Sequence, residues 1–186
     1  IKTFTSFVAF VVLAFLTACS DSPDPAAGFL EKLNASYEAA LDRSNGSAYM
    51  FPLGSVEEQT ALANLESFFS QMSPESVRSL SAEVYSEDAY LNDNIVGVFG
   101  LAKITDYFSH AAEQAEVLDV VFIDVARSEA DYFVRWRMTV QVPALNDGAP
   151  LVSYGVTQFR LNKEGKVLLH RDFWYAAMGL HEHLPY

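Results

Sequence analysis

Apolar residues in the first half of the chain recur every three to four positions, which places them on one face of a helix. Residues 29–41 predict a short first helix. Ser55 is the expected N-cap of a second helix, and Ser73 with Pro74 provides the cap and first position of a third. Residues 101–114 predict a fourth helix.

A turn leading into a short strand is expected at residues 86–93, and beyond residue 114 the apolar pattern becomes a strict alternation. The alternating segments are 117–125, 132–142 and 151–175, and the last is divided by Asn162-Lys163-Glu164-Gly165, a hairpin connection. Four long strands joined by short turns predict an antiparallel meander. The fold class is therefore α+β: a twisted antiparallel sheet with helices packed on one face.

The beginning of the chain has the pattern of a bacterial lipoprotein leader. Lys2 precedes a nearly unbroken apolar run, residues 4–16, which has the length of a signal-peptide core and is too short to span a membrane. The run ends in Leu-Thr-Ala-Cys, which resembles the lipobox, and Cys19 is the only cysteine of the chain. The alternative is that this tetrapeptide occurs in an apolar helix by chance.

This pattern predicts lipidation at Cys19 and a membrane-anchored protein of the bacterial cell envelope, with Ser20 slightly favouring the outer membrane. Four segments follow from it: a signal peptide at residues 1–18, a flexible tether at 19–28, an accessory helix and loop at 29–54, and the main domain at 55–186.

The chain is acidic, with 24 Asp and Glu against 12 Lys and Arg and a net charge of −12. Such a surface repels phosphate backbones, which excludes nucleic acid as an expected partner. Attachment to a membrane would then depend on the acyl chains of the anchor. With its single cysteine lipidated, the mature protein would have neither thiol chemistry nor an intrachain disulfide. No cofactor is predicted.

The last predicted strand carries the most unusual chemistry. His170, Asp172 and Trp174 alternate and therefore share one face of the strand, where a simple core would have aliphatic residues. His170 could equally be a buried histidine whose tautomer Asp172 fixes. Asp172 could instead form a structural ion pair with Arg135 or Arg137 on a neighbouring strand.

Three motifs, in this order and spacing, resemble the nuclear transport factor 2-like superfamily, in particular its SnoaL-like and ketosteroid-isomerase branches. They are YSEDAYLND at 85–93, Val96-Gly97, and FRLNKEGKV at 159–167, and the resemblance covers about residues 55–175. It implies a sheet that curls into a cone around about three helices, with a hollow for an apolar ligand. Many members use the hollow for acid/base chemistry on carbonyl, epoxide or polyketide substrates, and others only bind.

In ketosteroid isomerases an aspartate at the position of Asp93 is the general base. The two positions that supply the oxyanion hole there are occupied here by Phe69 and Thr157, so the resemblance does not imply that particular reaction. Asp93, His170 and Asp172 remain as a predicted catalytic set: a base, a proton carrier and an orienting carboxylate facing one another across the hollow. For Asp93 the alternative is a turn carboxylate that caps the loop before Val96.

The predicted wall of the ligand pocket consists of Phe69, Tyr107, Trp136, Thr157, Phe159 and Trp174. His181 and His183 have metal-ligand spacing but no evident third ligand, so no metal site is predicted.

Two functions fit these observations. The first is a lipid-anchored protein that binds a small, largely apolar ligand in the cone, with isomerase, dehydratase or hydrolase-like acid/base activity. The second is a non-catalytic module that forms a homodimer or binds another envelope protein through its sheet face. An open hollow of roughly 300 Å³ favours the first function. A hollow filled by Phe68, Phe69, Tyr107 and Trp174 favours the second.

Overall fold

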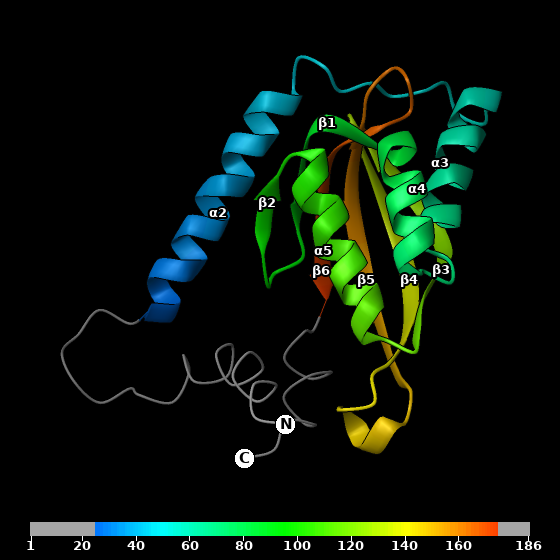
Figure 1. Ribbon diagram of the computed structural model, residues 1–186. Coiled ribbons are helices and arrows are strands. Elements are labelled where there is room, and N and C mark those ends of the chain that lie inside the picture. The colour runs from blue at the N-terminus through cyan, green and yellow to red at the C-terminus, as the bar shows by residue number, and fades with distance from the viewer. Residues whose placement is uncertain (1–24, 175–186) are drawn as a thin grey trace.

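A computed structural model describes residues 25–174 of the chain (Figure 1). The helices are α2 (Pro25–Ser44), α3 (Val56–Phe69), α4 (Pro74–Val84) and α5 (Leu101–Gln114), with a 3₁₀ turn η2 (Asn146–Gly148). The strands are β1 (Tyr85–Asn92), β2 (Gly97–Phe99), β3 (Val117–Ser128), β4 (Asp131–Gln141), β5 (Leu151–Leu161) and β6 (Val167–Trp174).

The strands form one six-stranded sheet in the order β2-β1-β6-β5-β4-β3. Strands β3 to β6 form the predicted antiparallel meander. The sheet curves around α3, α4 and α5, which confirms the predicted α+β class and cone-like fold (Figure 1). One feature was not predicted: β1 joins the meander parallel to β6, with Asn92 opposite Arg171, so the complete sheet is mixed.

Capping residues set the helix boundaries as predicted. The Ser55 side chain accepts a hydrogen bond from the Glu58 amide, and Ser73 forms a reciprocal capping box with Ser76. The end of α4 differs from the prediction. The helix passes directly into β1 at Tyr85, without the turn expected at residues 86–93.

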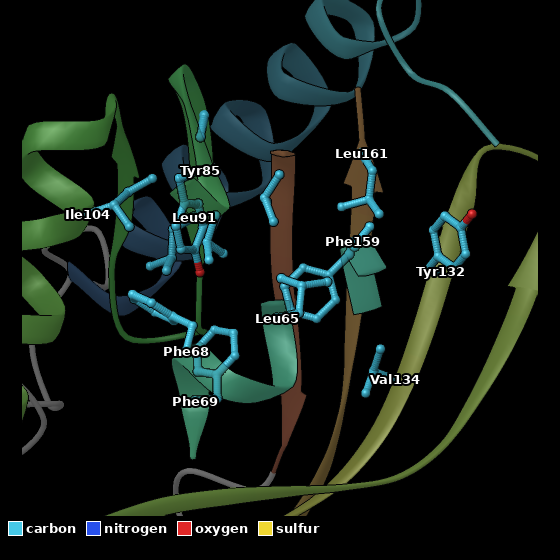
Figure 2. Packing of buried hydrophobic residues seen from close by; sticks show 14 of the residues in the cluster. Leu65, Phe68, Phe69, Tyr85, Leu91, Ile104, Tyr132, Val134, Phe159 and Leu161 are labelled. Atoms are coloured by element: carbon cyan, nitrogen blue, oxygen red, sulfur yellow. The ribbon is translucent and has the colours of Figure 1, made fainter. Parts of the chain in front are cut away.

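The main core lies between the inner face of the sheet and the helices α3, α4 and α5, and it is rich in aromatic rings. Edge-to-face contacts join Phe68 to Phe69, Tyr85 and Phe108 at centroid distances of 5.0–5.7 Å. Figure 2 shows Phe68 and Phe69 directed from α3 toward the sheet, among side chains of β1, β4 and β5. This core holds the curved sheet on its three helices.

Helix α2 packs on the opposite, outer face of the sheet, where a smaller apolar cluster joins Ala40, Tyr90 and Leu169. It begins at Pro25, so its first turn lies within the segment 19–28 that the sequence analysis assigned to a tether. Pro25 suits the first position of a helix, and the two alanines after it favour helix strongly, which explains the earlier start.

Several sequence predictions concern residues outside the described range: the leader, Cys19, His181 and His183. Within residues 25–174, no helix has the length and apolar character needed to cross a bilayer.

Candidate functional site

Asp172 is the centre of a buried polar network on the inner face of β6. Its Oδ1 accepts a hydrogen bond from His170 Nε2 at 3.0 Å and another from the Thr157 hydroxyl. On the other side of the imidazole, the Tyr85 hydroxyl lies 2.7 Å from His170 Nδ1. Because a carboxylate only accepts, the neutral histidine carries its proton on Nε2, and Tyr85 donates to Nδ1. His170 is 2% exposed, and both of its nitrogens are occupied.

Thr157 connects this network to β4. The Trp136 indole nitrogen donates to the Thr157 hydroxyl at 2.8 Å, and that hydroxyl in turn donates a hydrogen bond to Asp172. The indole ring lies over Gly155, where an added Cβ would be 2.3 Å from the nearest ring carbon. A glycine at position 155 is therefore what allows Trp136 to reach Thr157.

Asp93 follows β1 and accepts three hydrogen bonds. Its Oδ1 receives the backbone amides of Ile95 and Val96, both at 2.9 Å, and its Oδ2 receives the Tyr107 hydroxyl from α5. Asp93 therefore caps the loop before Val96, as the alternative interpretation of this residue proposed. Tyr107 adds a contact to α5 that a simple cap does not need.

Burial is the main cause that raises the pKa of Asp93 above its usual range, and the negative charge of Asp172 raises it further. The bonds from Tyr107, Val96 and Ile95 lower the pKa of Asp93 but do not cancel the rise. Burial and the two carboxylates also raise the pKa of Tyr107, which therefore stays protonated as a donor. A proton on Asp93 is consequently favoured at a higher pH than on an exposed aspartate.

The three predicted catalytic residues come together, but in a different arrangement from the one expected. Parallel pairing of β1 with β6 sets Asp93 beside Asp172, whereas the sequence analysis expected it across the hollow. The Trp174 indole donates to the Asp93 backbone carbonyl at 2.9 Å, and the Asn94 side-chain amide donates to the Asp172 backbone carbonyl at 3.0 Å. These bonds connect the ends of the two strands.

The predicted pocket residues divide into two groups. Tyr107 and Thr157 donate to the two carboxyl groups, whereas Trp136 donates to Thr157 and Trp174 to the Asp93 backbone carbonyl. Phe69 and Phe159 instead pack their rings on His170, at 5.6 and 4.8 Å, inside the filled core. Aromatic rings thus occupy the deep part of the cone (Figure 2). Asp172, at 18% exposed, is the member of the network that solvent reaches.

The alternative of an ion pair between Asp172 and Arg135 is not what the structure shows. Arg135 pairs with Asp124 on the neighbouring strand β3, so it does not bind Asp172, whose partners are His170 and Thr157. Tyr85 is a member of the network that was not predicted from the sequence. Tyr85 stands at the start of β1 and continues the apolar pattern of the preceding helix, so the sequence pattern did not indicate a polar contact with β6.

Within residues 25–174, no three His, Cys, Asp or Glu side chains are grouped so that they could hold a metal ion.

Comparison with solved structures supports the fold, at identities too low to carry function. A nuclear transport factor 2-like protein of unknown function from Exiguobacterium is 13% identical, with a TM-score of 0.53 over 62% of this chain and 98% of that one. A hypothetical protein with a ketosteroid isomerase-like fold from Catenulispora acidiphila, in complex with trimethylamine, is 14% identical. Its TM-score is 0.56 over 67% of this chain and 93% of that one.

An epoxide hydrolase of the LEH-like type from M. tuberculosis is 11% identical, with a TM-score of 0.53 over 68% of this chain and 87% of that one. A comparison with curated proteins finds no match. The model of one protein family, described as the SnoaL-like domain, matches residues 59–170, which include Asp93 and His170. Since that match spans more than half of the sequence, the chain belongs to the SnoaL-like domain family.

Proposed function

We propose that this chain is a lipid-anchored protein of the bacterial cell envelope that binds a small, largely apolar molecule and moves a proton on it. The observation that carries the proposal is the pair of carboxyl groups Asp93 and Asp172 at the end of β1 and β6. Burial, together with the negative charge of Asp172, raises the pKa of Asp93 and favours a proton on that carboxyl group.

The two carboxyl groups differ in a way that suggests separate roles. Within residues 25–174, the hydrogen bonds to the Asp172 carboxylate both reach Oδ1, so Oδ2 is available as the base. Asp93, with its raised pKa, is the group suited to carry a proton and donate it to the substrate as the general acid, while Asp172 keeps the proton that it removes. His170 has no free nitrogen and acts as a positioning residue that orients Asp172.

The substrate class follows from the surroundings of this pair. Aromatic rings from Tyr107 and Trp174 lie next to it, and a carbon acid such as an apolar ketone needs a base of this kind. Two similar solved structures are named putative isomerases, from Agrobacterium tumefaciens and Bacillus subtilis, and the M. tuberculosis neighbour is named an epoxide hydrolase. The filled interior leaves the partly exposed side of Asp172 as the place of approach.

The test is proton exchange on a model ketone. The chain from residue 20 onward is incubated with 2-tetralone in D₂O, and deuterium at the carbons next to the carbonyl is followed by NMR. We expect exchange above the buffer rate, and a loss of about 100-fold in both Asp93→Asn and Asp172→Asn, as is typical for a general base. The matched control Asp124→Asn changes an exposed carboxylate and retains the activity. Equal rates in all four proteins contradict the proposal.

A second candidate function, a module that pairs with itself or another envelope protein, is favoured by the filled interior of the cone and by the outer face of β3. Val121 and Ile123 are 40% and 45% exposed there, beside the Asp124–Arg135 pair, in the half of the face that α2 does not cover. Light scattering of the domain and of Val121→Ser with Ile123→Ser tests it. A dimer that becomes a monomer in the variant supports this function, and a monomeric parent contradicts self-pairing.

A further inference from the structure

We infer that the end of the domain that carries Asp93 and Asp172 rests against the surface of a neutral phospholipid bilayer. The inference deepens the proposed function and relies on its lipid anchor at Cys19. It specifies a surface for contact, which we call the apolar rim and define as Phe29, Leu30, Val152, Tyr154 and Phe173.

The direction of α2 places its beginning at this end. Near the end of the helix, the Leu41 carbonyl accepts a hydrogen bond from Arg160, close to the hairpin that starts β6. Earlier in the helix, Tyr37 lies under the Arg171 guanidinium at 3.9 Å, close to the end of β6. The helix and β6 therefore run in opposite directions, and the first turns of α2 lie beyond Arg171, at the end where β6 terminates (Figure 1).

The apolar rim gathers large exposed side chains at that end. Phe29 and Leu30 of α2 are 45% and 55% exposed, Val152 and Tyr154 of β5 are 53% and 63% exposed, and Phe173 of β6 is 43% exposed. Val156, paired with Phe173, shares the outer face of β5 with Tyr154 and Val152. Isolated exposed apolar residues are ordinary, but a group at one end of a molecule marks an interaction surface.

The length of chain before α2 determines which end can face the membrane. Pro25 is six positions after Cys19, and six fully extended residues span at most about 20 Å. Helix α2 has 20 residues and is therefore about 30 Å long. A lipid on Cys19 thus holds the beginning of α2 near the bilayer and keeps the opposite end, with Leu53 and Val56, away from it.

Charge determines the kind of bilayer. With a net charge of −12, the protein is repelled by anionic headgroups and has no excess of basic residues to bind them. Contact then depends on the apolar rim alone, which suits a zwitterionic surface. A small apolar ligand dissolved in such a bilayer would reach the exposed side of Asp172 from the membrane.

The experiment attaches the mature chain, beginning at Cys19, to vesicles of phosphatidylcholine with brominated acyl chains. The Cys19 thiol is coupled to a maleimide lipid, which replaces the natural anchor. Bromine quenches nearby tryptophan emission, and Trp174 lies at the end in question whereas Trp136 is 5% exposed inside the sheet. The variant is Phe29→Ser with Leu30→Ser, and the matched control is Leu53→Ser with Val56→Ser, at side chains that are 83% and 74% exposed.

We expect quenching in the parent and in the control, and a fall of about two-fold or more in the Phe29 and Leu30 variant, because burial of apolar area provides the contact. Replacing part of the lipid by phosphatidylglycerol is expected to reduce quenching in the parent. Equal quenching in all three proteins, or a loss confined to the Leu53 and Val56 variant, overturns the inference. So does a dimer in solution that the Phe29 and Leu30 substitutions dissociate, which assigns the apolar rim to a second copy.

Failure of the anchor is measured separately, by mass spectrometry of the Cys19 peptide from cells that express the full chain. An unmodified cysteine rejects the proposed lipidation whatever the vesicles show. A lipidated cysteine together with no quenching on vesicles rejects only the contact of the apolar rim with the bilayer.

Discussion

His170 and Asp172, two residues apart on β6, are joined through Nε2 and Oδ1 at 3.0 Å on the inner face of the sheet. The bond sets the proton of the neutral imidazole on Nε2 and leaves Nδ1 to accept from Tyr85. The same buried imidazole thus bonds Tyr85 in the core and Asp172 at the edge of the core. A change that removes these bonds is therefore expected to alter both the stability of the domain and the orientation of Asp172.

Replacing His170 with Leu is expected to destabilise the domain by about 2–4 kcal/mol, because the buried Tyr85 hydroxyl loses its acceptor and Asp172 loses a donor. Urea unfolding at pH 7 measures this change. The control is His110→Leu on α5, at a side chain that is 63% exposed, where a change below about 0.5 kcal/mol is expected. A loss below about 1 kcal/mol for His170→Leu would contradict the network.

The effect of Asp93→Asn on the stability of the folded protein is expected to become more favourable as the pH rises. Since the pKa of Asp93 is raised in the folded protein, its contribution to stability is complete below its unfolded pKa and is lost as the pH rises through the folded pKa. Asparagine has no such loss. The melting temperature of the variant minus that of the parent should therefore be larger at pH 8 than at pH 4.

Thermal unfolding at the two pH values gives this difference, and subtraction of the parent removes the effect of other titrating groups. Asp124→Asn, at a side chain that is 56% exposed, is the matched control. If the difference in melting temperature between Asp93→Asn and the parent is independent of pH, or is larger at pH 4, then burial does not destabilise the ionised Asp93 carboxylate.

Much of the fold could be predicted from the sequence because its elements have strong local signals. The caps Ser55 and Ser73 and the alternation after residue 114 correctly gave the helices and the meander. The pairing of β1 with β6 could not be predicted in this way, because a parallel contact between distant segments leaves no local pattern. The same limit explains why Asp93 was expected across the hollow from Asp172.

The candidate site shows the same division. Alternation along β6 correctly placed His170 and Asp172 on one face, since that depends on neighbours in sequence. The contact of Tyr85 with His170 could not be predicted, and the sequence left a filled and an open interior as alternatives, because the direction of a side chain in a core depends on packing against several elements. The catalytic roles of Asp93, His170 and Asp172 stay predictions, and the exchange experiment with 2-tetralone addresses them.

Gly155→Ala is expected to destabilise the domain by about 1–3 kcal/mol through overpacking, because the new Cβ would meet the Trp136 ring at 2.3 Å. Moving the ring also breaks its bond to Thr157. Urea unfolding gives the loss, and a shift in the tryptophan emission spectrum reports the displaced indole. Gly46→Ala is the control, since nothing lies within 4 Å of a Cβ at that position. Similar stabilities for the two variants would show that Trp136 has room to move.

Tyr37→Phe tests whether α2 is an integral part of the domain. The Tyr37 hydroxyl donates to Gln158 Oε1 at 2.6 Å, and Gln158 is 4% exposed, so the variant leaves a buried acceptor without its partner. The phenylalanine ring still stacks under Arg171, which isolates the hydrogen bond from the cation–π contact.

A loss of about 1–2 kcal/mol in the free energy of unfolding is expected for Tyr37→Phe in urea, together with faster amide hydrogen exchange in residues 25–44. Tyr154→Phe, at a side chain that is 63% exposed, should change neither measurement. If Tyr37→Phe speeds exchange in α2 without lowering the free energy of unfolding, α2 opens independently of the sheet. Phe29 and Leu30 then lie beside the β5 and β6 residues of the apolar rim in only one state of the molecule.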